Sequence, residues 1–295
     1  MNMSQYVRTM FHPEEGANPI QRIIKLFKRI IPVTVLVVIT CLVFYPFLFV
    51  ILTSLKTDSE VLVNPLGLPR NWLLQNYRTA WLEANFNIYF QNSVIILLPV
   101  VTTVTFISVL AGYAFSWLRF RWSNVLLVFF IAGLGLPLEA IIIPLYMIML
   151  DLNLLNSHWS VILPQIGLLM PFGILIMSGF FSQLPTELVD AAKVDGATSW
   201  QTLWYVLVPI ASPAIVSLII FASLWTWNSF FLPTVMLTAD SMRTLPLGLA
   251  HFIGEYQTEQ ARLAAGALIT AVPIIILYLL FQRQFVRGIT VGSMK

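Results

Sequence analysis

Long charge-free runs of apolar residues alternate with shorter polar segments along most of the chain. The runs predict helices over residues 30–54, 92–117, 123–149, 160–182, 206–232 and 263–282. A helix needs about 20 residues to cross the roughly 30 Å hydrocarbon layer of a bilayer, and each run supplies that length. Helices are predicted because open strands would leave backbone N–H and C=O groups unpaired in lipid. The pattern therefore predicts an all-α, polytopic membrane helix bundle with about six transmembrane helices.

Composition agrees with this prediction. Hydrophobic residues make up 58% of the 295 residues and charged residues 10%, with a mean hydropathy of +0.85. Soluble domains carry about 25% charged residues, so this chain cannot cover a water-facing surface of ordinary polarity. The net charge of +3 is too small to indicate a nucleic-acid partner. The composition indicates an integral membrane protein with the lipid bilayer as its surroundings.

The basic residues predict the orientation in the membrane. Among the 16 lysines and arginines, those on the predicted outer side are Lys56, Arg70, Arg78, Arg243 and Arg262. The others fall on the opposite side, which the positive-inside rule assigns to the cytoplasm. Tryptophans near the predicted span ends fit an interfacial belt: Trp72, Trp81, Trp117, Trp122, Trp159 and Trp204. We expect a multi-pass protein of a prokaryotic cytoplasmic (inner) membrane with both termini in the cytoplasm.

The chain divides into a short tail and one large region. Residues 1–29 are predicted to form a cytoplasmic tail, and residues 30–295 the transmembrane domain. In residues 19–29, Ile20, Ile23, Ile24 and Phe27 recur at helical spacing beside basic residues. This pattern fits either an amphipathic helix lying on the membrane or a simple extension of the first span.

The most informative segment is the predicted cytoplasmic loop 183–209. Pro185 is typical of a helix start, and Glu187 in the first turn complements the helix dipole. Gly196 is a natural helix stop, and Thr198 is a good N-cap for a second helix that leads into the fifth span. The sequence thus predicts a helix, a tight glycine turn and another helix.

The composition of this predicted hairpin favours contact with a partner protein, although an ordinary connecting loop is an equally good interpretation of these properties alone. Small alanines allow close approach, and Glu187, Asp190 and Asp195 offer negative charge.

The same residues resemble the signature loop of binding-protein-dependent ABC importer permeases. That signature is Glu-Ala-Ala, three residues, Gly, nine residues, Ile, one residue and Leu-Pro. The positions that match its spacing are Asp190, Ala191, Ala192, Gly196, Val206, Val208 and Pro209. Asp replaces Glu, and Val replaces both Ile and Leu, which are mild departures.

The resemblance covers about residues 30–295 and is closest to the second membrane subunit of maltose-type sugar importers. Further matching segments are residues 45–46, 54–56, 91–93, 111–115, 143–146, 154–157, 179–181 and 227–230. The family usually has an acidic residue where Ser229 stands, so a polar role at that position is not assumed. The resemblance implies the fold of a type I ABC importer transmembrane domain.

The resemblance also implies a mechanism and a set of partners. Loop 183–209 would sit in a cleft of a separate ABC ATPase subunit, present in two copies. ATP binding would close the two ATPases and switch the membrane cavity from inward-facing to outward-facing. An extracytoplasmic solute-binding protein would deliver a sugar to that cavity. A second related permease subunit would complete the complex, with a homodimer as the alternative.

Under this interpretation the chain has no enzymatic activity of its own and binds no cofactor. The partner subunits would use ATP–Mg. The sequence contains no Gly-x4-Gly-Lys-Ser/Thr phosphate-binding loop, and His12, His158 and His251 show no metal-ligand spacing.

A few polar and aromatic residues inside the predicted spans are candidates for the substrate path. Glu139 is the one charged residue within a predicted span, and intramembrane carboxylates are costly and often functional. The other candidates are Gln165, Trp225, Trp227 and Asn228. A structural role is an equal alternative for Glu139, and bundle packing is an alternative for the tryptophans. Glu139 also supports two rival functions, an ion-gradient-driven secondary transporter and an intramembrane enzyme.

Overall fold

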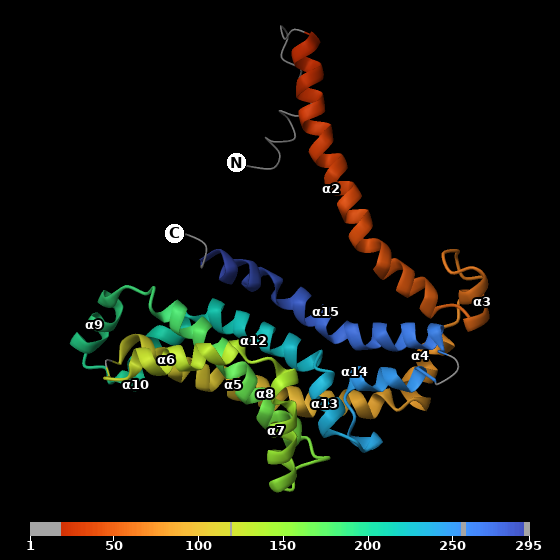
Figure 1. Ribbon diagram of the computed structural model, residues 1–295. Coiled ribbons are helices and arrows are strands. Elements are labelled where there is room, and N and C mark those ends of the chain that lie inside the picture. Colours follow the sequence, from red (N-terminus) through yellow and green to blue (C-terminus); the bar gives the residue numbers. More distant parts are fainter. Residues whose placement is uncertain (1–18, 119, 255–257, 292–295) are drawn as a thin grey trace. The chain divides into compact units, whose positions relative to one another are not determined.

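The computed structural model describes residues 19–118, 120–254 and 258–291, and the side chains of 30–118, 120–254 and 258–282 (Figure 1). Apart from one isolated bridge between Ile253 and Thr258, the regular elements of these residues are helices. The chain divides into two units, Met1–Leu52 and Thr53–Lys295. The prediction of an all-α membrane bundle is confirmed.

The first unit consists of most of helix α2 (Pro19–Ser54). Its apolar segment Ile30–Ser54 is 25 residues long, enough to cross a membrane, and matches the first predicted span. The helix also includes residues 19–29, so their backbone continues the first span. Whether those residues lie on the membrane surface remains a prediction, and residues 1–18 lie outside the described part of the chain.

Three further predicted spans form long helices in the second unit. They are α5 (Phe86–Trp117), α8 (Trp159–Phe181) and α15 (Gln260–Val291). Helix α5 begins six residues before the predicted 92 because Phe86 and Tyr89 are fully buried against the segment around Leu245 and Phe252. That packing extends the helix through polar residues that the hydropathy pattern had excluded.

The third predicted span, 123–149, is broken. It consists of α6 (Ser123–Ala132), the 3-10 turn η2 (Gly133–Gly135) and α7 (Leu138–Asp151), and the two parts are bent by 103°. Leu136 precedes Pro137, which disfavours helical geometry, and Leu136 is extended at φ −83° and ψ 111°. The span predicted over 123–149 is therefore two helices with a sharp break at Pro137, which together are long enough for one bent span.

The fifth predicted span, 206–232, is also interrupted. The chain forms α10 (Ser199–Gln201), the π-helical turn η3 (Thr202–Leu207), α11 (Val208–Ile210) and α12 (Ser212–Trp227). Segments Ser199–Ile210 and Ser212–Trp227 are bent by 76°. The span ends at Trp227 rather than 232, since α13 (Phe231–Met236) is separate. Four helices are long and apolar enough to cross a membrane, or up to six if each bent pair is one span.

Short helices order the segments between the spans. The segment after α2 contains α3 (Asp58–Val63), α4 (Gln75–Arg78) and the π turn η1 (Thr79–Glu83). The segment after α13 contains η4 (Asp240–Met242), α14 (Leu245–Gly248) and η5 (Leu249–Phe252). The remaining helix, α9 (Thr186–Val194), lies at the opposite end of the second unit from α14 (Figure 1).

Small residues allow α5 and α8 to approach closely along their length. A Cβ atom added at Gly112 would lie 2.6 Å from the Cβ of Met177 and 2.9 Å from the backbone nitrogen of Ser178. At Gly173 it would lie 2.1 Å from the hydroxyl of Ser108. In lipid, where apolar side chains gain nothing by leaving the solvent, close packing of this kind holds helices together. The α5–α8 pair is the centre of the larger buried cluster.

Side chains near the start of α5 bind the segment from η4 to α14, at the end of the second unit that is called the α14 end below. Asn92 donates hydrogen bonds from its amide to the carbonyls of Ser241 (2.8 Å) and Arg243 (2.9 Å). The hydroxyl of Ser93 accepts a hydrogen bond from the backbone N–H of Leu245 (2.8 Å). His158 Nε2 lies 3.1 Å from the amide oxygen of Asn92. Asn92 and Ser93, which are part of the family-like segment 91–93, therefore have a structural role.

We expect Gly112→Ala to destabilise the protein by about 1–3 kcal/mol, because the added methyl meets backbone atoms that cannot move locally. Gly167→Ala is the matched control, since no atom lies within 4 Å of a Cβ built there. Thermal unfolding in detergent measures both variants. Equal melting temperatures for the two would show that α5 and α8 are not locked at Gly112.

His158 makes the stability depend on pH. Burial lowers the pKa of its imidazole, so the folded protein takes up a proton there less readily than the unfolded chain does. As pH falls below about 6.5, the unfolded chain takes up a proton that the folded state resists, and stability decreases. The loss is small, below about 1 kcal/mol, because water still reaches the ring. Melting temperatures at pH 7.5 and 5.5 check this, and His158→Gln is expected to reduce the difference.

Candidate functional site

Loop 183–209 folds as a helical hairpin, as the sequence predicts. Helix α9 ends in a Schellman motif, in which Ala197 N–H donates to the Ala192 carbonyl (2.9 Å) and Gly196 N–H to that of Lys193 (3.0 Å). Gly196 has φ +79°, a left-handed conformation that suits glycine. The glycine therefore sets the reversal of chain direction at the tip of the hairpin.

The second arm of the hairpin begins with a complete capping box. The hydroxyl of Thr198 accepts a hydrogen bond from Gln201 N–H at 3.3 Å, and the Gln201 side chain accepts one from Thr198 N–H at 2.8 Å. These reciprocal bonds satisfy two donors that a helix start would otherwise leave free. Because α9 also packs against η3, the two arms form one unit.

The structure places the residues predicted for the coupling loop in three environments. Ala192 is buried with Val189 between the arms of the hairpin. The residues exposed on α9 and its turn are Glu187, Asp190, Ala191, Asp195 and Gly196. Val206 and Val208 are half-buried and Pro209 is exposed, all in the segment that leads into α12. Within the first exposed group, Asp190, Ala191, Asp195 and Gly196 lie toward the tip of the hairpin, whereas Glu187 lies in the first turn of α9.

The exposed surface of α9 is mildly acidic. Asp190 pairs with Lys193 at 3.1 Å, with both side chains about two-thirds exposed at 66% and 67%. An exposed pair of this kind contributes at most about 1 kcal/mol and is screened by salt. Glu187 and Asp195 have no ion pair among the described residues. The net negative charge therefore remains open to a partner.

Three apolar side chains on the hairpin were missed by the sequence analysis. Val194, Tyr205 and Trp200 are 88%, 79% and 58% exposed. The sequence did carry a signal for Val194, since it lies five residues after the buried Val189 and so points away from the buried stripe at 100° per residue. Trp200 contacts Trp204, with ring centroids 5.6 Å apart. The hairpin thus presents apolar and acidic groups together.

Pro209 explains the π turn before it. A proline ring in a helix clashes with the carbonyl four residues earlier and provides no N–H. Immediately before it, Val208 N–H bonds to the Leu203 carbonyl, one residue further back than in an α-helix. The wider turn relieves the clash, and Pro213 then starts α12 beyond the 76° bend.

The substrate-path candidates lie in different environments. Trp225 is 52% exposed and its ring lies 4.8 Å from that of Phe172, edge to face. Trp227 is buried, and its indole N–H donates to the carbonyl of Thr270 on α15 at 2.9 Å. Asn228 is exposed at the end of α12, where its amide donates to the Leu224 carbonyl. Trp227 therefore packs inside the bundle, whereas Trp225 is in contact with aromatic rings on one side and exposed on the other.

The other two candidates are on different helices, Gln165 on α8 and Glu139 on α7. Gln165 is 5% exposed, and its amide oxygen has no hydrogen-bond partner among the described residues. Glu139 is exposed in the first turn of α7, directly after the 103° break. A carboxylate at a helix N-terminus complements the dipole, which is a structural reason for its position.

Comparison with known proteins gives the family. Residues 104–291 match the model for the "Binding-protein-dependent transport system inner membrane component". The arabinooligosaccharide transport permease AraQ of Halalkalibacterium halodurans is 34% identical over 85% of this chain and 91% of its own length. The trehalose/maltose transport permease MalG of Thermococcus litoralis is 31% identical over 92% and 98%.

A solved structure shows the same fold. It is a bacterial ABC transporter involved in import of the acidic polysaccharide alginate, with a TM-score of 0.75 and 23% identity over 91% of this chain and 99% of that one. The family match covers more than half of the described helices, including the hairpin, and two relatives exceed 30% identity over most of their length. The chain belongs to the family of inner membrane components of binding-protein-dependent transport systems, the permease subunits of ABC importers.

Proposed function

We propose that this chain is one of two membrane-spanning permease subunits of an ATP-driven importer that carries an oligosaccharide or related carbohydrate into the cytoplasm. Two ABC ATPase subunits, a second related permease and an extracytoplasmic solute-binding protein complete the complex. The observation that carries the proposal is the exposed hairpin of α9, Gly196 and α10, formed by the residues that match the family signature.

The hairpin is suited to dock in a cleft of the ATPase. Its tip exposes the small Ala191 beside the apolar Val194, with Asp190 and Asp195 on the rim. A patch with an apolar centre and charged edges resembles the usual composition of protein interfaces. Because α9 and η3 pack as one unit, a push on the tip would displace both arms together rather than unfold one of them.

The hairpin connects directly to a span. Its second arm runs through η3 and α11 into α12 at the 76° bend. Closure of the two ATPases would therefore move α12, and with it the residues near its end. Under this proposal, alternating access follows from that movement, and the chain itself needs no nucleotide site. ATP–Mg is used by the partner subunits.

The carbohydrate assignment comes from the relatives, which are named for arabinooligosaccharide and trehalose/maltose transport. Trp225 and Asn228 are the side chains of this chain best placed to meet such a substrate. They lie three residues apart on one face of α12, and both are exposed. An exposed aromatic ring offers a flat apolar surface, and an amide offers hydrogen bonds to hydroxyl groups.

The ion-driven and enzymatic alternatives are not proposed. Both depend on Glu139 as a carboxylate at membrane depth, and its exposed place in the first turn of α7 gives it a structural explanation. The relatives are, in addition, ABC transporter permeases. Uptake that continued without ATP but stopped without an ion gradient would revive the first alternative.

Gly196→Val is expected to weaken ATPase docking about tenfold, because a β-branched residue at φ +79° strains the turn by roughly 1–3 kcal/mol. Gly196→Asn is the matched control, since asparagine tolerates this conformation. Membrane insertion should stay normal in both. Co-purification of the ATPase and substrate-stimulated ATP hydrolysis measure the effect. Wild-type coupling in the valine variant would contradict the role of this turn.

Trp225→Ala is expected to raise the sugar concentration for half-maximal uptake by roughly threefold to tenfold, the worth of an aromatic contact. Trp225→Phe should retain most of the uptake because it keeps a flat ring. Trp227→Phe tests the other indole and should lower thermal stability, since the Thr270 carbonyl loses its donor. Unchanged uptake in Trp225→Ala, at normal protein level, would remove Trp225 from the substrate path.

A further inference from the structure

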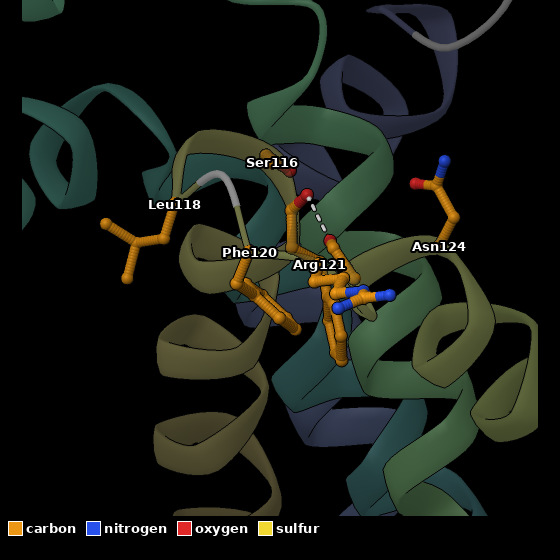
Figure 2. Close-up of a pocket in the computed structure, with 7 residues that line it drawn as sticks. Ser116, Leu118, Phe120, Arg121 and Asn124 are labelled. Carbon is orange, nitrogen blue, oxygen red and sulfur yellow. Dashed lines mark hydrogen bonds between the residues drawn. The ribbon is translucent and has the colours of Figure 1, made fainter.

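A pocket of about 400 Å³ lies where α5 ends and α6 begins (Figure 2). Its lining residues are Phe115, Ser116, Leu118, Phe120, Arg121, Ser123 and Asn124. The volume is within the range of small-molecule sites, about 300–1,000 Å³. The transport function proposed above does not use this pocket.

Among the described lining residues, Arg121 carries a positive charge beside neutral polar groups, and none of them is a carboxylate. The Arg121 guanidinium lies 5.9 Å from the ring centre of Trp122, a cation–π contact that restricts its position. In Figure 2, Arg121 lies beside Phe120, between Leu118 on the left and Asn124 on the right. Among the described residues, neither the guanidinium nor the Asn124 amide has a protein hydrogen-bond partner or ion-pair partner.

The hydroxyl groups in the pocket are committed to the protein. Ser116 donates to the carbonyl of Ser178 at 3.0 Å, which ties the end of α5 to α8. Ser123 donates to the carbonyl of Phe115 at 3.4 Å, the dashed bond in Figure 2. Within the described part of the lining, the Arg121 guanidinium and the Asn124 amide are the side-chain donors that remain for a ligand. Both suit a group with several acceptor oxygens, and the planar guanidinium in particular matches a phosphate.

The start of α6 adds a weaker positive contribution. Its N-cap residue, Trp122, makes no side-chain capping bond. The positive end of a helix dipole favours anions within the first turn, where Ser123 and Asn124 lie. This effect accompanies Arg121 and does not by itself define a site.

The position of the pocket points to lipid as the source of the anion. It lies between the ends of two strongly apolar helices, beside the exposed Trp122 in the chain, and tryptophan is a residue type enriched at the level of the headgroups. Part of its wall is apolar, formed by Phe115, Leu118 and Phe120. A soluble anion gains little from such a wall, whereas a phospholipid places its glycerol and upper acyl groups there.

We propose that this pocket binds the headgroup of an anionic phospholipid. The phosphodiester accepts hydrogen bonds from Arg121 and Asn124 near the start of α6, and the glycerol backbone lies against Phe115 and Phe120. Basic pockets between membrane helices on the cytoplasmic side take anionic headgroups for these reasons. The charge distribution of the sequence predicts that side for this loop.

The test uses the assembled transporter and phosphatidylglycerol as the probe. Native mass spectrometry of the detergent-solubilised complex counts bound lipid against added phosphatidylglycerol, with phosphatidylcholine as the neutral comparison. Arg121→Gln should weaken the tightest phosphatidylglycerol binding about tenfold, as expected for a lost charge-assisted contact. Arg121→Lys should lose less, because it keeps the charge without the planar fork. Arg78→Gln, an exposed arginine on α4, is the charge-matched control and should bind as the wild type.

Several outcomes would overturn the proposal. Equal phosphatidylglycerol binding in wild type and Arg121→Gln removes lipid from this pocket. Displacement of the lipid by millimolar inorganic phosphate identifies a free-anion site instead. Loss of the ATPase from Arg121→Gln without loss of lipid identifies a protein contact. If Arg121→Gln does not assemble, Asn124→Leu takes its place, and lipid retention at the wild-type level in that variant overturns the proposal in the same way.

Discussion

The absence of water from the hydrocarbon layer constrains every part of this protein. Each backbone N–H and C=O group there must find a partner within the chain, and helices provide those partners locally. The same constraint explains where irregular backbone is found. The break between α6 and α7 has its own 3-10 turn, and the bend between α11 and α12 follows a π turn, so neither interruption abandons local hydrogen bonding. Prolines and glycines change the direction of the helices without leaving long unpaired stretches.

Close packing then determines how the helices associate. Small residues let α5 and α8 come within backbone contact distance at Gly112, and side-chain amides take over where the helices end. At the α14 end, the Asn92 side chain is hydrogen-bonded to two carbonyls and to His158. At the α9 end, the Schellman motif and the capping box stabilise the turn of the hairpin. The two ends thus have different chemistry. At the α14 end, hydrogen bonds join residues that are far apart in the sequence. In the hairpin, they join residues that are close in the sequence, so the hairpin is a self-contained unit.

The shape of the hairpin and of the bend beyond it is set by individual residues, each acting on the backbone next to it. Gly196 reverses the chain, Thr198 starts the second arm, Pro209 widens the turn and Pro213 starts α12 in a new direction. These residues lie within the segment that matches the family signature or directly after it. The signature therefore encodes the geometry of an arm joined to a span, in addition to the exposed residues at its tip. The proposed coupling to an ATPase depends on that geometry.

The sequence by itself determined the class of protein, the approximate spans and the hairpin, because all three follow from local properties. Hydrophobic length sets a span, and glycine and N-cap residues act within one turn of a helix. Only the tertiary structure decided that Trp225 is exposed while Trp227 is buried, since each depends on which helix lies opposite. It also decided the size of the two bends and the early start of α5 at Phe86, whose burial comes from residues more than 150 positions away. Contacts between distant segments produce no periodic pattern in a single sequence. The hydropathy pattern could therefore locate the helices but not determine which face of each helix is buried.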